Sequence, residues 1–124
     1  MSQMGERDDP TKAVLDATGK RYLVEHQEAE DGSWWYDLYS DGFIRQGGLV
    51  DMPNVEYTMT ATINFPKTIT RMLNPNAVPY SSPNNGAGVT IKSWTKNSIT
   101  ISVEDEHNYV NQPMQCFWVV EAIA

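Results

Sequence analysis

WWYDLYSDGFIRQGG, the stretch from Trp34 to Gly48, decides the fold that this sequence predicts. Aromatic and aliphatic residues at Trp34–Tyr39 and Phe43–Gln46 indicate two strands, because such side chains bury large areas on a pleated surface. The Asp41-Gly42 pair between them is a strong hairpin signal, since Gly takes a positive φ and Asp tolerates one. We expect Gly47-Gly48 to end the second strand, and these glycines would also allow a bulge or a close backbone approach. The rest of the chain is expected to fold against this hairpin.

The downstream sequence repeats the short-strand pattern several times. Tyr57–Phe65 alternates apolar with polar residues, which is typical of a half-buried antiparallel strand. Met114–Ile123 is apolar on both faces and should be a central strand. Further strands are predicted at Arg21–Glu25, Lys67–Leu73, Val89–Trp94 and Ser98–Val103, with a turn at Met52–Asn54 and loops at Gln27–Ser33, Asn74–Gly88 and Glu104–Pro113. About seven or eight short strands with closely spaced turns predict an all-β fold, an antiparallel β-sandwich.

The first part of the chain differs from the rest in composition. Residues 1–20 are predicted to be a lead or connector, and residues 21–124 are predicted to form the sandwich domain. Pro10–Ala17 has the pattern of a short, minor helix, with Asp9 as its N-cap and Gly19 as its stop signal. An irregular linker explains the same residues equally well, so both interpretations remain open.

Bulk composition narrows the classes of function. The 124 residues carry a formal net charge of −7, which disfavours binding to a phosphate backbone, so no nucleic-acid partner is expected. Cys116 is the single cysteine and allows no disulfide within the chain, and its apolar surroundings indicate a buried thiol. No apolar run is long enough to span a membrane, and the N-terminus lacks a signal-peptide pattern. We therefore expect a protein that is made in a cytosol and does not insert into membranes.

The sequence contains no recognisable catalytic or metal-binding motif, so no enzyme activity, cofactor or metal is predicted. His26 and His107 are far apart in the sequence and neither has a partner at ligand spacing. Asp105-Glu106-His107 is better explained as a solvated loop than as a cation site, because hard cations need six or more converging oxygens. Asp31, Asp37 and Asp41 raise the alternative of a glycosidase, which needs two carboxylates at a fixed separation.

Two polar loops carry the clearest signal for recognition. Asn74–Gly88 and Glu104–Pro113 combine amides, hydroxyls and aromatic rings, which suit sugars because rings stack on C–H surfaces and amides pair with hydroxyls. Trp94 joins them because it is out of phase with the apolar face of its strand. The candidate ligand-binding residues are Tyr80, Asn84, Asn85, Trp94, His107, Asn108 and Tyr109. The alternative is that these loops are ordinary β-connections rich in turn-forming residues.

The string YSDGFIRQGG, Tyr39 to Gly48, resembles the hairpin of a C-terminal domain of bacteriophage tail fibres and related tail proteins. That family typically has Ser-Asp-Gly-Trp, a variable residue, and Glu-Gln-Gly-Gly. Here Phe43 replaces the tryptophan and Arg45 the glutamate. The upstream run RYLVEHQEAEDGSWWY and the ending CFWVVEAIA are also similar, so the resemblance extends in outline from Tyr22 to Ala124.

The resemblance implies a function that composition and spacing do not. It implies a tail-fibre tip domain in the virion, made in the host cytoplasm, joined to other tail proteins and assembled as a homotrimer. Such a domain would attach to a bacterial surface receptor, a glycan being expected, by multivalent binding without chemistry. The candidate residues for the trimer interface or core are Trp34, Trp35, Tyr36, Phe43, Phe117 and Trp118. The alternatives are a purely structural trimerisation or connector module and a carbohydrate-active enzyme.

Overall fold

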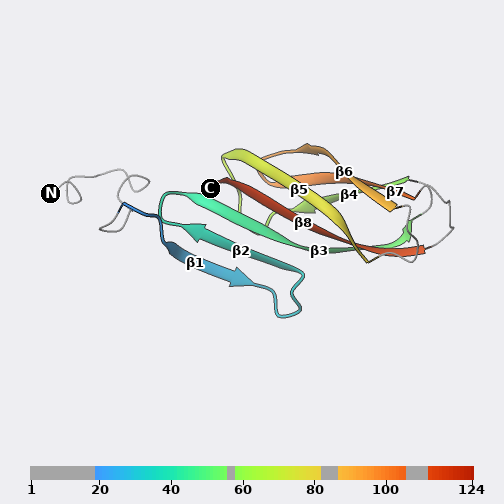
Figure 1. Cartoon of the computed structure of the whole chain (residues 1–124), viewed down its shortest axis with the longest axis horizontal. Coiled ribbons are helices and arrows are strands. Elements are labelled where there is room, and N and C mark those ends of the chain that lie inside the picture. The colour runs from blue at the N-terminus through green and yellow to red at the C-terminus, as the bar shows by residue number, and fades with distance from the viewer. Residues whose placement is uncertain (1–18, 56–57, 82–86, 106–111) are drawn as a thin grey trace.

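The computed structural model describes residues 19–55, 58–81, 87–105 and 112–124, which form eight strands in two antiparallel sheets (Figure 1). The larger sheet has the order β1 (Leu23–Glu28), β2 (Trp34–Tyr39), β3 (Phe43–Val55), β8 (Gln112–Ile123) and β5 (Arg71–Ser81). The smaller sheet has the order β4 (Thr58–Asn64), β7 (Ser98–Asp105) and β6 (Ala87–Trp94). The predicted all-β sandwich is therefore confirmed.

No helix occurs in the described part of the chain, and so none there is long and apolar enough to cross a membrane. The possible helix at Pro10–Ala17 lies outside the described residues.

The predicted hairpin forms between β2 and β3. Gly42 has a φ of 89° and donates its N–H to the carbonyl of Tyr39 at 3.0 Å, while the Asp41 carboxylate accepts the N–H of Phe43 at 3.1 Å. Arg21 braces the turn through an ion pair with Asp41 at 2.7 Å, and its guanidinium lies 4.4 Å from the centre of the Phe43 ring. The Asp-Gly signal thus specified the turn correctly.

The prediction that Gly47-Gly48 ends the second strand was wrong, because β3 continues to Val55. The glycines instead allow a close backbone approach. A Cβ on Gly47 would overlap the carbonyl oxygen of Trp118, and a Cβ on Gly48 would overlap the carbonyl oxygen of Ser33. The missing side chains therefore let β3 continue between β2 and β8 at a point where no other residue fits.

Further boundaries differ from the predictions. The first strand continues to Glu28, into the expected loop at Gln27–Ser33, and the strand expected at Lys67–Leu73 begins only at Arg71. The turn expected at Met52–Asn54 is a register shift within β3, and β5 runs from Arg71 to Ser81 through much of the expected loop at Asn74–Gly88. Pro75 and Pro79 suggested a loop, but β5 is an edge strand, where a residue without an N–H is tolerated. By contrast, the predicted hairpin of β6 and β7 and the central position of the last strand are confirmed.

The core lies between the two sheets and is closed by apolar side chains that alternate along the strands. Figure 1 shows the smaller sheet stacked on β3, β8 and β5, while β1 and β2 extend beyond it. Cys116 is fully buried against Met52, with 3.8 Å between the sulfur atoms, and burial raises the pKa of its thiol. The buried apolar residues are Tyr36, Ile44, Met52, Phe65, Ile69, Ile99, Ile101, Val103, Met114, Cys116, Trp118, Val120 and Ala122.

The connection between β4 and β5 is held to both sheets. The fully buried Gln46 side chain donates to the carbonyl of Lys67 at 2.8 Å and accepts the N–H of Lys67 at 3.0 Å. On the other side, Phe65 and Ile69 donate their N–H groups to carbonyls of the β6–β7 turn, at Asn97 and Lys96. These bonds satisfy backbone groups of a crossing segment that has no strand partner.

Replacing Gly48 by alanine should lower the free energy of unfolding by about 3 kcal/mol, because the new methyl group must displace the backbone at Ser33. Gly88→Ala is the matched control, since Gly88 also lies in a strand but an added Cβ meets nothing within 4 Å. Urea denaturation of both variants at one protein concentration measures the difference. Equal denaturation midpoints for the two variants would show that the close approach is not a constraint.

Candidate functional site

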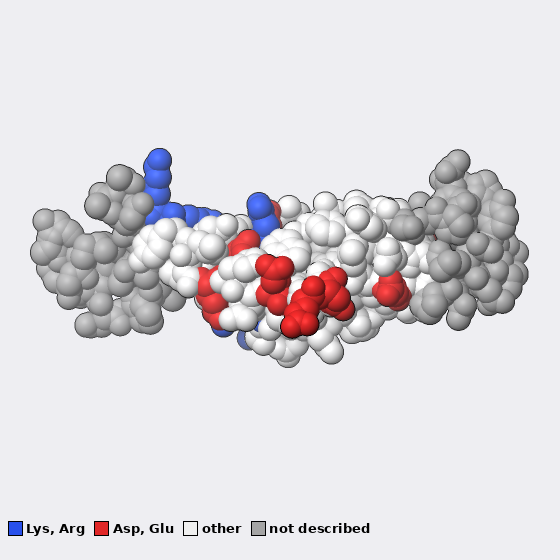
Figure 2. All heavy atoms as spheres, turned by 90° about the horizontal axis from the view of Figure 1, so that it is seen from below, with Lys and Arg blue, Asp and Glu red and all other residues white. Residues whose placement is uncertain are grey.

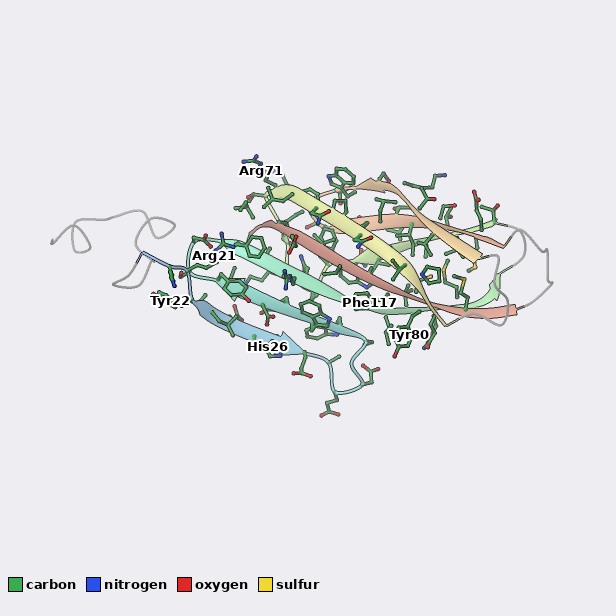
Figure 3. The ribbon with its side chains drawn as sticks, in the orientation of Figure 1. Arg21, Tyr22, His26, Arg71, Tyr80 and Phe117 are labelled. Atoms are coloured by element: carbon green, nitrogen blue, oxygen red, sulfur yellow. The ribbon has the colours of Figure 1, made fainter. Side chains whose placement is uncertain are left out.

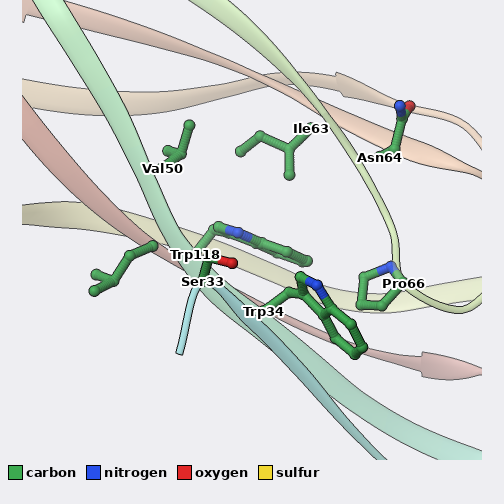
Figure 4. Close-up of a pocket in the computed structure, with 8 residues that line it drawn as sticks. Ser33, Trp34, Val50, Ile63, Asn64, Pro66 and Trp118 are labelled. Atoms are coloured by element: carbon green, nitrogen blue, oxygen red, sulfur yellow. The ribbon is translucent and has the colours of Figure 1, made fainter. Parts of the chain in front are cut away.

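A pocket of about 320 Å³ opens between the sheets, at the border where the smaller sheet ends and β2 begins (Figure 4). We call it the Trp34 pocket. Its lining residues are Ser33, Trp34, Leu49, Val50, Ile63, Asn64, Pro66 and Trp118. A concave, mostly apolar pocket with a few polar groups is the usual form of a small-molecule site.

Two tryptophans form one side of the pocket and differ in how they are held. Trp118 is 1% exposed and stacks on Phe65, with ring centres 5.9 Å apart and an interplanar angle of 29°. Trp34 is 37% exposed and lies beside Pro66 at the rim. The pocket therefore has one rigid, buried indole and one indole that solvent reaches.

Gly48 places Trp34 at this rim. Ser33 crosses β3 directly over Gly48, where an added Cβ would also come within 2.9 Å of the Trp34 Cα atom. The Leu49 N–H donates to the Ser33 carbonyl at 3.2 Å and fixes the crossing. The entry to β2 thus lies against the face of β3, and Trp34 follows at the edge of the core.

The second hollow lies on the opposite side of the larger sheet, which we call the outer face because the smaller sheet covers the other side. It has a volume of about 370 Å³. Trp35, Gly47, Val119 and Asn76 face one another across four strands. The Trp35 ring lies over the glycine, with its Cζ2 atom 3.1 Å from the place that a Cβ would take. The lining residues are Trp35, Arg45, Asn74, Asn76, Phe117, Val119 and Glu121.

A charged row crosses the outer face next to these apolar side chains. Arg45 donates to one oxygen of Glu121 through Nη2 at 2.6 Å and Nε at 3.1 Å, and Asn74 donates to the other oxygen at 3.3 Å. These hydrogen bonds, that of Arg45 being the largest, hold the pKa of Glu121 below its ordinary value. Arg45, which departs from the tail-fibre motif, therefore has a defined ion-pair partner on β8.

His26 has partners that sequence spacing did not reveal. Its Nδ1 lies 2.5 Å from an oxygen of Asp37 and its Nε2 lies 2.8 Å from an oxygen of Glu28. The pairing of β1 with β2 sets His26 directly opposite Asp37, eleven residues further along the chain. The bond with Asp37, followed by that with Glu28, raises the pKa of the imidazole above 6.5.

The three carboxylates that suggested a glycosidase each hold a local structural contact. Asp31 accepts the N–H of Ser33 at 2.9 Å, Asp37 pairs with His26, and Asp41 caps the hairpin turn. They lie on two turns and one strand. Within the described residues no group of three or more histidine, cysteine or acidic side chains could hold a metal ion.

The structure separates the described members of the predicted ligand set. Tyr80 is 63% exposed near the end of β5, whereas Trp94 is 49% exposed beside Met72, near the start of β5. Figure 3 shows Arg71 and Tyr80 at opposite ends of that strand. Asn84, Asn85, His107, Asn108 and Tyr109 lie outside the described residues. Tyr80 and Trp94 therefore do not belong to one site.

The six candidates for an interface or core fall into three groups. Tyr36 and Trp118 are buried within the single chain, and the Tyr36 hydroxyl donates to Glu25 at 2.7 Å, which raises the pKa of Tyr36 to about 12. Trp34 lines its pocket. The half-buried side chains that remain on the outer face are Trp35, Phe43 and Phe117.

Sequence reasoning missed Asn64 and Pro66 as site residues. They were interpreted only as the end of an alternating strand, and the join between β4 and the entry of β2 is a contact between distant segments. The one available signal in the sequence was the Gly47-Gly48 pair, which predicted a close backbone approach but not which segment makes it.

Acidic side chains gather along one edge of the molecule. Figure 2 shows Asp and Glu on the edge formed by β1 and the turn that follows it, where Glu28, Glu30 and Asp31 are exposed. An edge of this charge repels phosphate groups and disfavours contact with anionic partners on that side.

Comparison with known proteins gives structural relatives. No family model and no curated protein matches the chain in sequence. The fold is similar to the C-terminal part of the R1 pyocin fibre of P. aeruginosa, with a TM-score of 0.54 and 18% identity over 88% of this chain and 32% of that one. The R2 pyocin fibre of P. aeruginosa gives a TM-score of 0.54 and 22% identity over 77% of this chain and 26% of that one.

An N-truncated R1-type pyocin tail fibre gives a TM-score of 0.50 and 18% identity over 77% of this chain and 85% of that one. The chain spans about a third and a quarter of the length of the first two structures. At these identities the likeness shows a shared fold.

Raising the pH should remove a stabilising contribution of His26. Because its folded-state pKa is raised, this contribution is fully present below pH 6.5 and is lost as the pH rises through the folded pKa. The melting temperature of the wild type should exceed that of His26→Gln at about pH 5.5, and the gap should shrink by about pH 8.5. Thermal scans at both pH values measure this. The charged groups that face the imidazole are Asp37 and Glu28.

An NMR titration of the His26 ring protons provides the independent check, with the variant assigning the resonance. A pKa at or below 6.5, or a melting gap that does not change with pH, would contradict the pairing.

Proposed function

We propose that this chain is the tip domain of a tail fibre of a phage or phage-like particle, and that it attaches to a bacterial surface by non-covalent binding. The shared fold with the C-terminal parts of pyocin fibres carries this proposal. The Tyr39–Gly48 motif supports it, because this motif forms the hairpin on which β8 and the core depend. An activity without chemistry is in keeping with the carboxylates, since Asp31, Asp37 and Asp41 hold structural contacts.

We propose that three copies assemble through the outer face. Rows of apolar side chains cross this face on both sides of the charged row: Phe43 opposite Ile123, Trp35 near Val119, and Leu49 beside Phe117 and Val78. No described segment covers them. A patch of this kind marks an interaction surface, and copies that contact through different surfaces of each chain close into a ring.

The charged row would not oppose such an assembly. Arg45 and Glu121 are already paired within one chain, so they need no partner from the next copy and would not leave a buried charge unpaired. A ring built in this way buries the outer face and leaves the smaller sheet and the Trp34 pocket accessible in each copy.

Three identical sites on one rigid tip would bind a repetitive surface more strongly than one site. Linked sites raise the overall affinity by about 10²–10⁴ without any new contact, provided that the geometry lets them engage together. A weak receptor site on each copy therefore suffices for attachment.

The purely structural connector remains the second candidate, because the outer face would serve it equally well. Both candidates predict a trimer, but only the attachment domain predicts binding to cells.

The native mass tests the assembly. The wild type should run at about 42 kDa, three times the 14.0 kDa chain. Phe117→Glu should run as a folded monomer, because three extra carboxylates would be buried without partners. Thr60→Glu is the control, since Thr60 is exposed on the smaller sheet. Light scattering gives the masses and circular dichroism the fold; a monomeric wild type contradicts the trimer.

Cell binding tests the attachment. Fluorescently labelled wild type should adsorb to at least one strain of a bacterial panel, and monomeric Phe117→Glu should bind about 10²-fold more weakly. Flow cytometry measures both. Trimers that bind no strain would favour the connector, and a monomer that binds as well as the trimer would contradict multivalent attachment.

A further inference from the structure

We propose that the Trp34 pocket binds one neutral pyranose ring. This inference rests on the proposed attachment to a bacterial surface and assigns the contact to a place that the two predicted loops do not include. The pocket, its two indoles and its few polar groups carry the argument.

The size and shape of the pocket suit a single ring. Its volume of about 320 Å³ is at the lower end of the range of small-molecule sites, about 300–1,000 Å³. The buried Trp118 forms a fixed wall, because it is stacked on Phe65 and 1% exposed. Figure 4 shows Val50 and Ile63 opposite the indoles, so a flat ligand would lie between an aromatic and an aliphatic wall.

The lining also favours an uncharged ligand. No Lys, Arg, Asp or Glu belongs to it, so a charged ligand would lose its hydration without gaining an ion pair. A neutral pyranose combines a C–H face, which stacks on an indole, with hydroxyl groups at its edge. A purely apolar ligand would not use the polar groups at the rim.

Polar groups lie at the mouth of the pocket. Ser33 lines the pocket beside Trp34, and the end of β4 lines it at Asn64, whose backbone pairs with Ser98. Hydroxyl groups and backbone carbonyls of this kind form hydrogen bonds with sugar hydroxyls. The Asn64 amide itself points away from the indoles (Figure 4), on the exposed face of β4 that also carries Thr60 and Thr62.

Trp34 is the residue that solvent and ligand would meet first. Its exposure of 37% is large for a tryptophan that borders the core, and Pro66 beside it restricts the ring. The outer face lies on the other side of the larger sheet, so the proposed trimer would leave this pocket open in all three copies.

Saturation-transfer NMR tests the proposal on the full chain, with methyl glycosides of glucose, mannose, galactose and rhamnose, and N-acetylglucosamine, as probes at millimolar concentration. At least one neutral probe should receive saturation, and glucuronate should not. Trp34→Ala should weaken binding about tenfold and Trp34→Phe less, because a phenyl ring keeps a smaller stacking face. Trp94→Ala is the matched control, because Trp94 is similarly exposed but lies outside the pocket, and it should bind like the wild type.

Binding of no neutral probe overturns the proposal, as does equal loss in Trp94→Ala and Trp34→Ala, or glucuronate binding as tightly as the neutral sugars. Trp34→Phe keeps the test valid if Trp34→Ala does not fold, since it retains an aromatic ring at the rim. The mass and cell binding of the same variants separate the two proposals. A trimer that binds cells but no probe would support the proposed function and contradict sugar binding in the Trp34 pocket. A monomer that binds a probe would support sugar binding in the pocket and contradict the trimeric attachment.

Discussion

Two consecutive residues without side chains set the spacing on which this sandwich depends. At Gly47 the backbone of β8 approaches, and at Gly48 the backbone leading into β2 crosses over, so β3 is held between two neighbours at distances that exclude a Cβ. Backbone contacts of this closeness fix the relative positions of three strands more tightly than side-chain packing alone. The position of Trp34 at the mouth of its pocket and that of the Trp35 ring over Gly47 both follow from this one constraint.

The larger sheet has two faces of different chemistry. One face carries the core, in which Ile44, Met52 and Trp118 are fully or almost fully buried. The other alternates apolar rows with a charged row centred on Arg45 and Glu121. A sheet face that must remain in water is usually polar throughout, and one that joins a fixed partner is usually apolar with satisfied charges. The outer face matches the second description, which is why we place assembly there and recognition elsewhere.

Local signals in the sequence predicted local structure well. The Asp41-Gly42 turn, the alternation of β4 and the two-sided apolarity of β8 each depend on neighbours in the chain, and each gave the correct element. The predictions of where β3 ends and of a loop in place of β5 were wrong. A glycine pair and two prolines indicate breaks in a strand unless the position of that strand in the sheet is known. A glycine is required at position 48 because the Ser33 backbone lies where a Cβ would be. Pro75 is tolerated within a strand because β5 lies at the edge of its sheet.

The candidate site depended on the same kind of information. Trp34 was singled out from the sequence, but as an interface or core residue. Its neighbour Asn64 ends a strand of the other sheet, and Pro66 lies in the connection that follows that strand. The partners of His26 were also missed, since Asp37 reaches it only through the register of β1 and β2. Residues far apart in sequence converge only when strand pairing is known, so composition could suggest sugar recognition but could not place it.

The prolines of β5 have a consequence for how such molecules behave when crowded. Exposed sheet edges join readily to those of other molecules, and this is a common route to aggregation. Pro75 and Pro79 each remove one N–H donor from β5, at one edge of the larger sheet, while β1 at the other edge carries Glu25, His26 and Glu28. Copies of this chain at a high local concentration would therefore be less able to join edge to edge into continuous sheets.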